Sequence, residues 1–239
     1  MDTTTFEVET PDGPMPVYRA KPDEGPAKAA VIVIQEAFGV NDHIEDVTRR
    51  FAAEGYHAVA PHLFHRAGGG TAPYDDFSKV LPLFKGLDDG KILQDVDTLI
   101  DAFGQRGFVP QHIGLVGFCM GGRISFLVAA RRKLGAAVGF YGGGIVTARF
   151  PQFPALVDEA ATLQTPWLGL FGDTDESIPV EDVEQLRSAL EAAPVAHEVV
   201  RYPGAGHGFH NDVRPAFEPA AAADGWERTL AWFASHLPG

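Results

Sequence analysis

The most restrictive feature of the sequence is residues 29–35, in which apolar and β-branched side chains follow one another without alternation up to Gln35. A strand with one face in water alternates apolar and polar side chains, and this segment does not. Uninterrupted apolar runs of this length are typical of strands covered on both faces, as in a parallel sheet packed between helices. The sequence therefore predicts a parallel β-sheet that begins here.

Other segments extend this pattern along the chain. Apolar runs predict further strands at residues 57–60, 113–117, 136–141, 167–171 and 198–202. Apolar residues at helical spacing predict helices at residues 42–54, 91–103, 124–133, 183–192 and 220–236. Before the sheet, residues 4–9 and 15–20 flank Asp12-Gly13, which favours a tight turn and predicts an antiparallel hairpin. Together, these strands, helices and the hairpin predict one α/β domain over residues 1–239, with about eight strands in a mostly parallel sheet and helices on both faces.

Composition narrows the surroundings in which the chain is expected to work. Its single cysteine excludes an internal disulfide, and residues 1–10 have neither the basic start nor the apolar run of a secretion signal. No stretch approaches the ~18 consecutive apolar residues of a membrane span. A formal net charge of −13 opposes binding to nucleic acid and to anionic membranes, which requires an excess of Lys and Arg. We expect a cytosolic monomer whose partner is a small molecule.

A cysteine bracketed by glycines follows one of the predicted strands. The motif G-F-C-M-G-G begins at Gly117 and leads into a helix, which makes it a cysteine variant of the nucleophile elbow. So sharp a turn leaves no room for side chains at Gly117 and Gly121. It places the Cys119 thiol at a helix N-terminus, which favours a thiolate, and leaves the Met120 N–H free to bind an oxyanion. A lone cysteine is more often a small buried hydrophobe. It is the place of Cys119 within this motif that favours a nucleophile.

A thiol nucleophile needs a base, and elbows of this kind are followed along the chain first by an acid and then by a histidine. The loop after residues 167–171 carries two acids, of which the D-x-x-I-P pattern selects Asp175, whereas Asp173 suits a turn. His207 lies in the glycine-rich sequence G-A-G-H-G-F, where an imidazole can reach a neighbouring elbow. Cys119, Asp175 and His207 therefore occur in the required order.

The other histidines carry a weaker signal. A histidine in a loop is more often a surface residue, and this is the interpretation for His62, His65 and His210, although each can border the pocket.

Three motifs, V-I-V-I-Q-E-A-F-G-V-N, G-L-V-G-F-C-M-G-G and G-A-G-H-G-F, resemble the dienelactone hydrolase family of α/β-hydrolases, and the likeness extends over nearly the whole chain. The resemblance implies Cys119 as nucleophile, His207 as base and Asp175 as the acid that orients the base. It also implies that Glu36 lies beside the resting thiol and accepts its proton when substrate binds, so that free Cys119 resists oxidation. The alternative for Glu36 is a charged residue that faces water at the end of a strand.

The resemblance also supplies candidates for holding the substrate. It implies the Ala37 N–H as a second oxyanion donor and Tyr141 in the pocket lining, although Tyr141 equally suits the core. Members that act on dienelactone hold its carboxylate with two arginines, whose positions correspond here to Arg66 and Asn211. The neutral amide of Asn211 cannot replace a bidentate arginine contact to a carboxylate. The resemblance therefore implies the class of reaction but not the identity of the substrate. Arg214 is a possible substitute for the missing arginine, and a solvated loop position is the alternative for Arg66.

Together these residues predict a hydrolase that opens an ester or a lactone through a thioester on Cys119. We expect no metal and no cofactor, because the histidines lack zinc-ligand spacing and the sequence has no P-loop. Two alternatives remain. One is a thioesterase or general carboxylesterase in which residues 66–88 form an apolar lid. The other is a catalytically silent protein that binds a small metabolite or senses redox state through Cys119.

Overall fold

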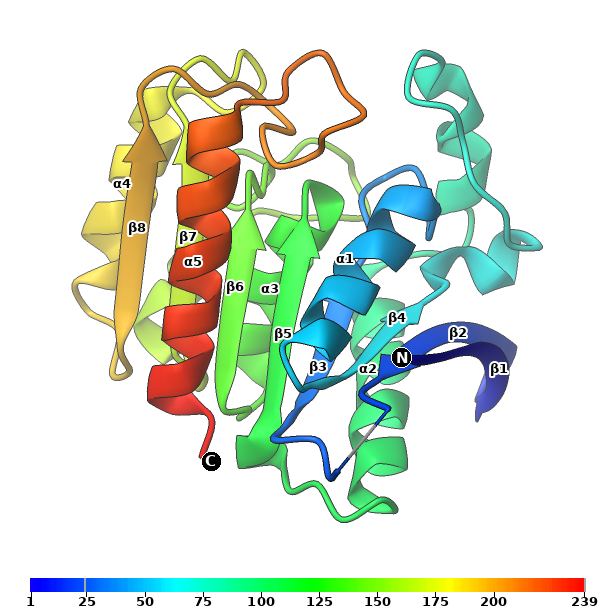
Figure 1. Ribbon diagram of the computed structural model, residues 1–239. Helices are drawn as coiled ribbons and strands as arrows, with labels where there is room; N and C mark the ends of the chain where they lie inside the picture. Colours follow the sequence, from blue (N-terminus) through cyan, green and yellow to red (C-terminus); the bar gives the residue numbers. More distant parts are fainter. Residues whose placement is uncertain (24, 239) are drawn as a thin grey trace.

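The computed structural model describes residues 1–23 and 25–238, which form one eight-stranded sheet with helices on both faces (Figure 1). The strands are β1 (Asp2–Thr10), β2 (Gly13–Lys21), β3 (Ala30–Ile34), β4 (His57–Pro61), β5 (Ile113–Phe118), β6 (Ala136–Phe140), β7 (Trp167–Gly172) and β8 (His197–Tyr202). The helices are α1 (Asp42–Ala53), α2 (Asp89–Gly104), α3 (Met120–Arg131), α4 (Val180–Leu190) and α5 (Pro219–His236). Short 3₁₀ helices are η1 (Leu63–Ala67), η2 (Phe77–Lys79), η3 (Leu81–Phe84), η4 (Pro110–His112) and η5 (Val157–Thr162).

The sheet confirms the predicted architecture. Its strand order is β1-β2-β4-β3-β5-β6-β7-β8, with β1 and β2 as an antiparallel hairpin that joins β4 antiparallel, and all remaining pairs parallel. Every residue of β3, β5, β6 and β7 is buried, as expected for strands covered on both faces. Helices α1 and α5 lie on one face, and α2, α3 and α4 lie on the other (Figure 1).

Three helices begin two or more residues earlier than predicted. The expected starts at residues 91, 124 and 183 were late by two to four residues, because α2, α3 and α4 begin at Asp89, Met120 and Val180. The first turn of α3 contains two glycines and no apolar stripe, so the sequence shows no helical periodicity in that turn. In α2 the start is set by the Asp88 side chain, which accepts a hydrogen bond from the Lys91 N–H.

The parallel strands place the predicted functional residues at one end of the sheet. Glu36 follows β3, Cys119 follows β5, Asp175 follows β7 and His207 follows β8, so all four lie beyond carboxyl ends of parallel strands. These ends point upward in Figure 1, and the segment between β4 and α2 also rises at that end. This is the edge at which open parallel sheets assemble their binding sites.

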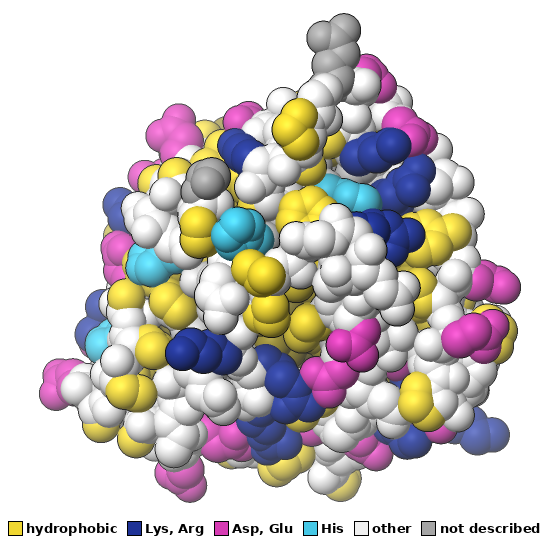
Figure 2. Space-filling model, turned by 90° about the horizontal axis from the view of Figure 1, so that it is seen from below, with side chains coloured by type: hydrophobic (Ala, Val, Ile, Leu, Met, Phe, Trp, Pro, Cys, Tyr) yellow, Lys and Arg dark blue, Asp and Glu magenta, His cyan; other side chains and the backbone are white. Residues whose placement is uncertain are grey.

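The opposite end of the molecule has a mixed surface. Lys and Arg side chains occur there together with Asp and Glu, with His and hydrophobic side chains between them (Figure 2). This end is therefore not a uniformly basic surface of the kind that binds phosphate backbones. Within residues 1–23 and 25–238, none of the helices combines the length and the hydropathy that a membrane span requires.

Candidate active site

The turn that carries Cys119 is strained and closely packed. Cys119 has φ 55° and ψ −113°, in a region that L-residues rarely adopt, and α3 begins immediately after it. A side chain at Gly117 would overlap the backbone of Gly121, and one at Gly121 would overlap the carbonyl of Ile34. The two glycines are therefore required by close approach of the backbone, as predicted, and the turn holds the thiol at the end of the sheet.

The three residues predicted from their order along the chain form a continuous series of contacts. Cys119 Sγ lies 3.1 Å from His207 Nε2, and His207 Nδ1 lies 2.6 Å from Asp175 Oδ2. The Asp175 carboxyl is buried, at 4% exposure, whereas Cys119 is partly exposed. An imidazole is thus held between a thiol on one side and a carboxylate on the other.

Electrostatics favour charge separation within this chain of contacts. Burial alone would raise the pKa of the Cys119 thiol, but the charge of His207 and its hydrogen bond outweigh burial and lower it. Burial opposes a charged His207 as well, yet Cys119 and Asp175 together raise the pKa of this imidazole. A hydrogen bond from the Met120 N–H also favours the ionised sulfur. Both shifts favour the thiolate and imidazolium form of the pair over the neutral form.

This ion pair has a testable consequence for the reactivity of Cys119. The thiolate exists above the lowered pKa of the thiol and is lost as pH falls through it, so the rate of alkylation by iodoacetamide should rise at a lower pH than for an ordinary thiol. In His207→Gln the cost of burial is no longer offset, and we expect the midpoint of the alkylation rate to rise by more than about one pH unit. The measurement is the alkylation rate between about pH 5 and 9. His236→Gln, a substitution at the far end of α5, is the control, and equal midpoints in all three proteins would refute the ion pair.

Glu36 lies in a network that the sequence did not indicate. It is fully buried, and its Oε2 accepts hydrogen bonds from Tyr74 Oη at 2.9 Å and from Asn211 Nδ2 at 3.1 Å. Arg214 Nη1 lies 3.7 Å from the other carboxylate oxygen. Glu36 therefore does not face water. In this arrangement Cys119 Sγ contacts His207, and the charge of Glu36 is near enough to raise the pKa of the thiol.

Ser177 is a second contact that sequence reasoning missed. Its Oγ and its N–H donate to Asp175 Oδ1 at 2.6 Å and 2.8 Å, and the same Oγ lies 3.3 Å from His207 Nδ1. Burial would raise the pKa of Asp175, but the hydrogen bonds from His207 and Ser177 lower it. The only sequence signal for this role is a hydroxyl two residues after the acid, in D-E-S-I-P. Ser177 fixes the orientation of the carboxylate that contacts the imidazole.

A pocket of about 440 Å³ opens over these residues. Cys119, Met120, His207 and Ser177 form part of its lining, together with Ala37. Met120 is the first residue of α3, so its N–H has no acceptor within the helix. The structure thus brings both predicted oxyanion donors, Ala37 and Met120, to the same pocket as the thiol.

Comparison with known proteins identifies the family of the chain. The sequence matches the family model described as the dienelactone hydrolase family over residues 15–237. The chain belongs to this family. A Salmonella typhimurium protein, provisionally named carboxymethylenebutenolidase, is 44% identical over 230 aligned residues, and the match covers 93% of this chain and 83% of the relative. A Bradyrhizobium protein, provisionally named 2-oxo-3-(5-oxofuran-2-ylidene)propanoate lactonase, is 30% identical over 93% of this chain and 90% of the relative.

A solved structure extends the comparison to three dimensions. The crystal structure of a provisionally named dienelactone hydrolase from Klebsiella pneumoniae superimposes with a TM-score of 0.88. It is 40% identical in sequence, and the match covers 98% of this chain and 99% of that one. The predicted α/β-hydrolase fold and family are confirmed, and the chain is an enzyme of the hydrolase class.

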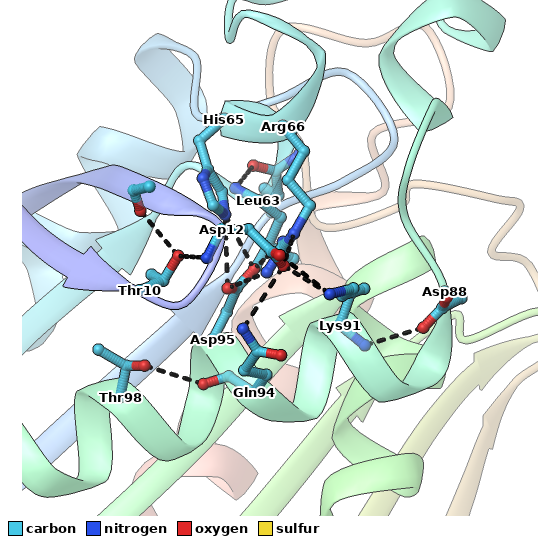
Figure 3. Close-up of polar contacts among 12 residues, drawn as sticks. Thr10, Asp12, Leu63, His65, Arg66, Asp88, Lys91, Gln94, Asp95 and Thr98 are labelled. Atoms are coloured by element: carbon cyan, nitrogen blue, oxygen red, sulfur yellow. Dashed lines mark hydrogen bonds and ion pairs between the residues drawn. The ribbon is translucent and has the colours of Figure 1, made fainter.

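The arginine predicted to bind substrate lies elsewhere in this dienelactone hydrolase family member. Arg66, in η1, donates two hydrogen bonds of 2.7 Å to Asp95 and one of 2.8 Å to Asp12 (Figure 3). Its side chain is only 8% exposed, so it is not a solvated loop residue either. Among the described residues that line the pocket Arg66 does not occur, whereas Arg214 does. Arg66 ties η1 to helix α2 and to the hairpin turn.

Tyr141 and Asn211 also lie outside the described pocket lining. Tyr141 is fully buried, and its ring packs 5.2 Å from the His207 ring, so it supports the imidazole from below the pocket surface. Asn211 is fully buried and donates to Glu36 and Tyr74. The expectation of a surface position was wrong for His210, which is 3% exposed, because its ring packs 5.1 Å from that of Phe118 in the core.

Proposed function

We propose that this enzyme hydrolyses a carboxylic ester or a lactone through a covalent thioester on Cys119. The observation that carries the proposal is the unbroken series of contacts from Cys119 through His207 to Asp175 at the wall of the pocket. A thiol paired with an oriented imidazole is an activated nucleophile. The pocket is large enough for a small organic molecule, and we infer that such a molecule is the partner.

The proposed reaction begins at the sulfur of Cys119. The thiolate attacks the carbonyl carbon and forms a C–S bond, while the carbonyl electrons move to oxygen, to which the N–H groups of Met120 and Ala37 donate. Collapse breaks the C–O bond, and the imidazolium of His207 protonates the departing oxygen. Water then attacks the thioester and gives a proton to His207. The second collapse releases the acid and restores the thiolate and imidazolium.

Glu36 is assigned a regulating role in this scheme. Burial and, to a smaller extent, the charge of Glu36 oppose the thiolate form of Cys119. The carboxylate is held in place by Tyr74, Asn211 and Arg214, so its charge stays near the sulfur throughout. We propose that Glu36 limits how much thiolate is present before substrate enters. A cytosolic location and a monomeric state stay predictions.

The substrate we propose is an activated ester or an enol-lactone. A thiolate displaces a good leaving group from a carbonyl more readily than it displaces an amine, so peptides are poor candidates. The relatives named above carry lactone names, and an enol-lactone releases a stable enolate. However, Arg66 and Asn211 are both engaged within the protein, so the two-arginine clamp for a carboxylate is not available here. We therefore propose the family's reaction class with a substrate that differs from dienelactone itself.

The test is hydrolysis by the wild-type protein of two substrates in parallel, dienelactone and p-nitrophenyl acetate, followed by ultraviolet absorbance. We expect efficient hydrolysis of the acetate and slower hydrolysis of dienelactone. Efficient hydrolysis of dienelactone would show that it is held without the arginine clamp, and would overturn the proposed difference in substrate. If neither substrate reacts, the protein is a binding or redox-sensing member of the family and the catalytic proposal fails. A rate that rises steadily with acyl-chain length would point instead to a thioesterase or general carboxylesterase.

A further inference from the structure

One wall of the pocket is built from three phenylalanine rings. Phe84 comes from η3, and Phe150 and Phe153 follow β6 in the chain. The ring of Phe84 lies 5.4 Å from that of Phe150 and 5.9 Å from that of Phe153, and both pairs meet edge to face. Rings packed edge to face expose both ring faces and ring edges to a neighbour. This wall therefore offers aromatic contacts to a ligand.

A second aromatic wall comes from other parts of the chain. Phe38 follows β3 and Phe77 begins η2, and their rings lie 6.4 Å apart at an angle of 81°. Tyr74 packs 4.7 Å from Phe38 and donates to the buried Glu36, which anchors this wall to the sheet. Phe77 is 48% exposed, so an apolar ring stands free in water at the pocket. An apolar ligand that covers this ring removes its surface from water, which contributes favourable free energy to binding.

Apart from the Cys119 and His207 pair, the charged side chains that line the pocket have one sign. No Asp or Glu occurs among its described lining residues, which include three arginines. Arg123 is neutralised by Asp89, to which it donates two hydrogen bonds. Arg149 donates to the Ser177 carbonyl, and Arg214 lies 5.8 Å from the centre of the Phe38 ring. A cationic ligand is therefore disfavoured, and the remaining binding energy comes from apolar and aromatic contacts.

From these walls we infer that the physiological substrate carries an aryl group, which packs between Phe84, Phe150 and Phe153 on one side and Phe38 and Phe77 on the other. The inference rests on the ester or lactone hydrolysis proposed above and names its substrate class. A volume of about 440 Å³ falls in the range of sites for drug-sized ligands, well above the needs of a small monocyclic lactone. Five rings that line one pocket recognise an aryl group better than a flexible alkyl chain, because stacked and edge-to-face geometry adds to apolar burial.

The experiment compares esters that are matched in size and differ in aromaticity. On the acyl side, the 2,2,2-trifluoroethyl esters of phenylacetic, cyclohexylacetic, hexanoic and acetic acid are used, because their leaving group is small. On the alcohol side, benzyl acetate is compared with cyclohexylmethyl acetate. Acid release is followed with a pH indicator, and each kcat/KM is divided by the rate of alkaline hydrolysis. We expect the aryl ester to exceed its cyclohexyl partner by about 10-fold on at least one side.

Variants locate the preference in the pocket. Phe150→Leu keeps an apolar side chain but removes a ring, and the ratio of aryl to cyclohexyl ester should fall below about 3-fold. Phe6→Leu changes a half-buried phenylalanine of β1, outside the described pocket lining, and should leave the ratio unchanged. If wild type hydrolyses the esters with no aryl preference on either side, the inference is overturned while the proposed function stands. If it hydrolyses none of them, the proposed function fails as well.

Discussion

Replacing Cys119 with alanine is expected to lower kcat/KM for p-nitrophenyl acetate by about 10⁴-fold or more. The covalent step disappears with the sulfur, and only the oxyanion donors and binding in the pocket remain to accelerate attack by water. The loss should be in kcat, because the pocket that sets KM keeps its other lining residues. The measurement is release of p-nitrophenolate under saturating substrate. Circular dichroism and thermal melting of the variant confirm that its fold is intact.

A matched substitution makes this result specific to the sulfur. Cys119→Ser retains a nucleophilic atom on the same strained turn, but a hydroxyl is far less acidic than a thiol, so its activity should fall between those of wild type and Cys119→Ala. Because Cys119 is the only cysteine, one equivalent of a thiol reagent should abolish wild-type activity. Retention of more than a tenth of the wild-type rate by Cys119→Ala would place hydrolysis at another group and refute the proposed nucleophile.

Replacing Asp95 with alanine is expected to destabilise the fold by about 3–5 kcal/mol and to lower the melting temperature by roughly 10 °C. Asp95 is fully buried on α2, and Arg66 donates to both of its carboxylate oxygens (Figure 3). His65 Nε2 lies 3.4 Å from the same carboxylate. Removing the carboxylate of Asp95 leaves the guanidinium of Arg66, which is itself largely buried, without its main counter-charge. Thermal melting followed by circular dichroism measures the effect.

Asp97, two residues further along α2, provides the control. It pairs with Arg132 in a similar two-pronged geometry, but its side chain is 43% exposed, so Asp97→Ala should cost less than about 1 kcal/mol. Arg66→Ala should likewise lower stability and leave KM unchanged, because Arg66 lies outside the described pocket lining. A raised KM with unchanged stability would instead support the substrate contact that the sequence suggested for Arg66. Equal melting temperatures for Asp95→Ala and Asp97→Ala would refute the structural role.

Much of the architecture was predictable because local patterns report burial. An apolar run without alternation, as in β3, needs cover on both faces, and the helical stripes between such runs supply that cover. The glycines around Cys119 were equally informative, because Gly117 and Gly121 occupy places where no side chain fits. Helix starts were less predictable, since the first turn of α3 carries glycines in place of an apolar stripe.

The sequence by itself determined the fold class and the residues that follow the parallel strands, because strand periodicity and chain order are local properties. It did not determine which side chains meet. Asn211 and Glu36 are 175 residues apart, and Arg66 and Asp95 are 29 apart, yet each pair shares hydrogen bonds. Those contacts engage Arg66 and Asn211, which the resemblance had assigned to substrate binding. Five phenylalanines from different parts of the chain form the walls of the pocket. Only the tertiary structure decided these partners, because hydrogen bonds and aromatic packing depend on distances between segments that no local pattern records.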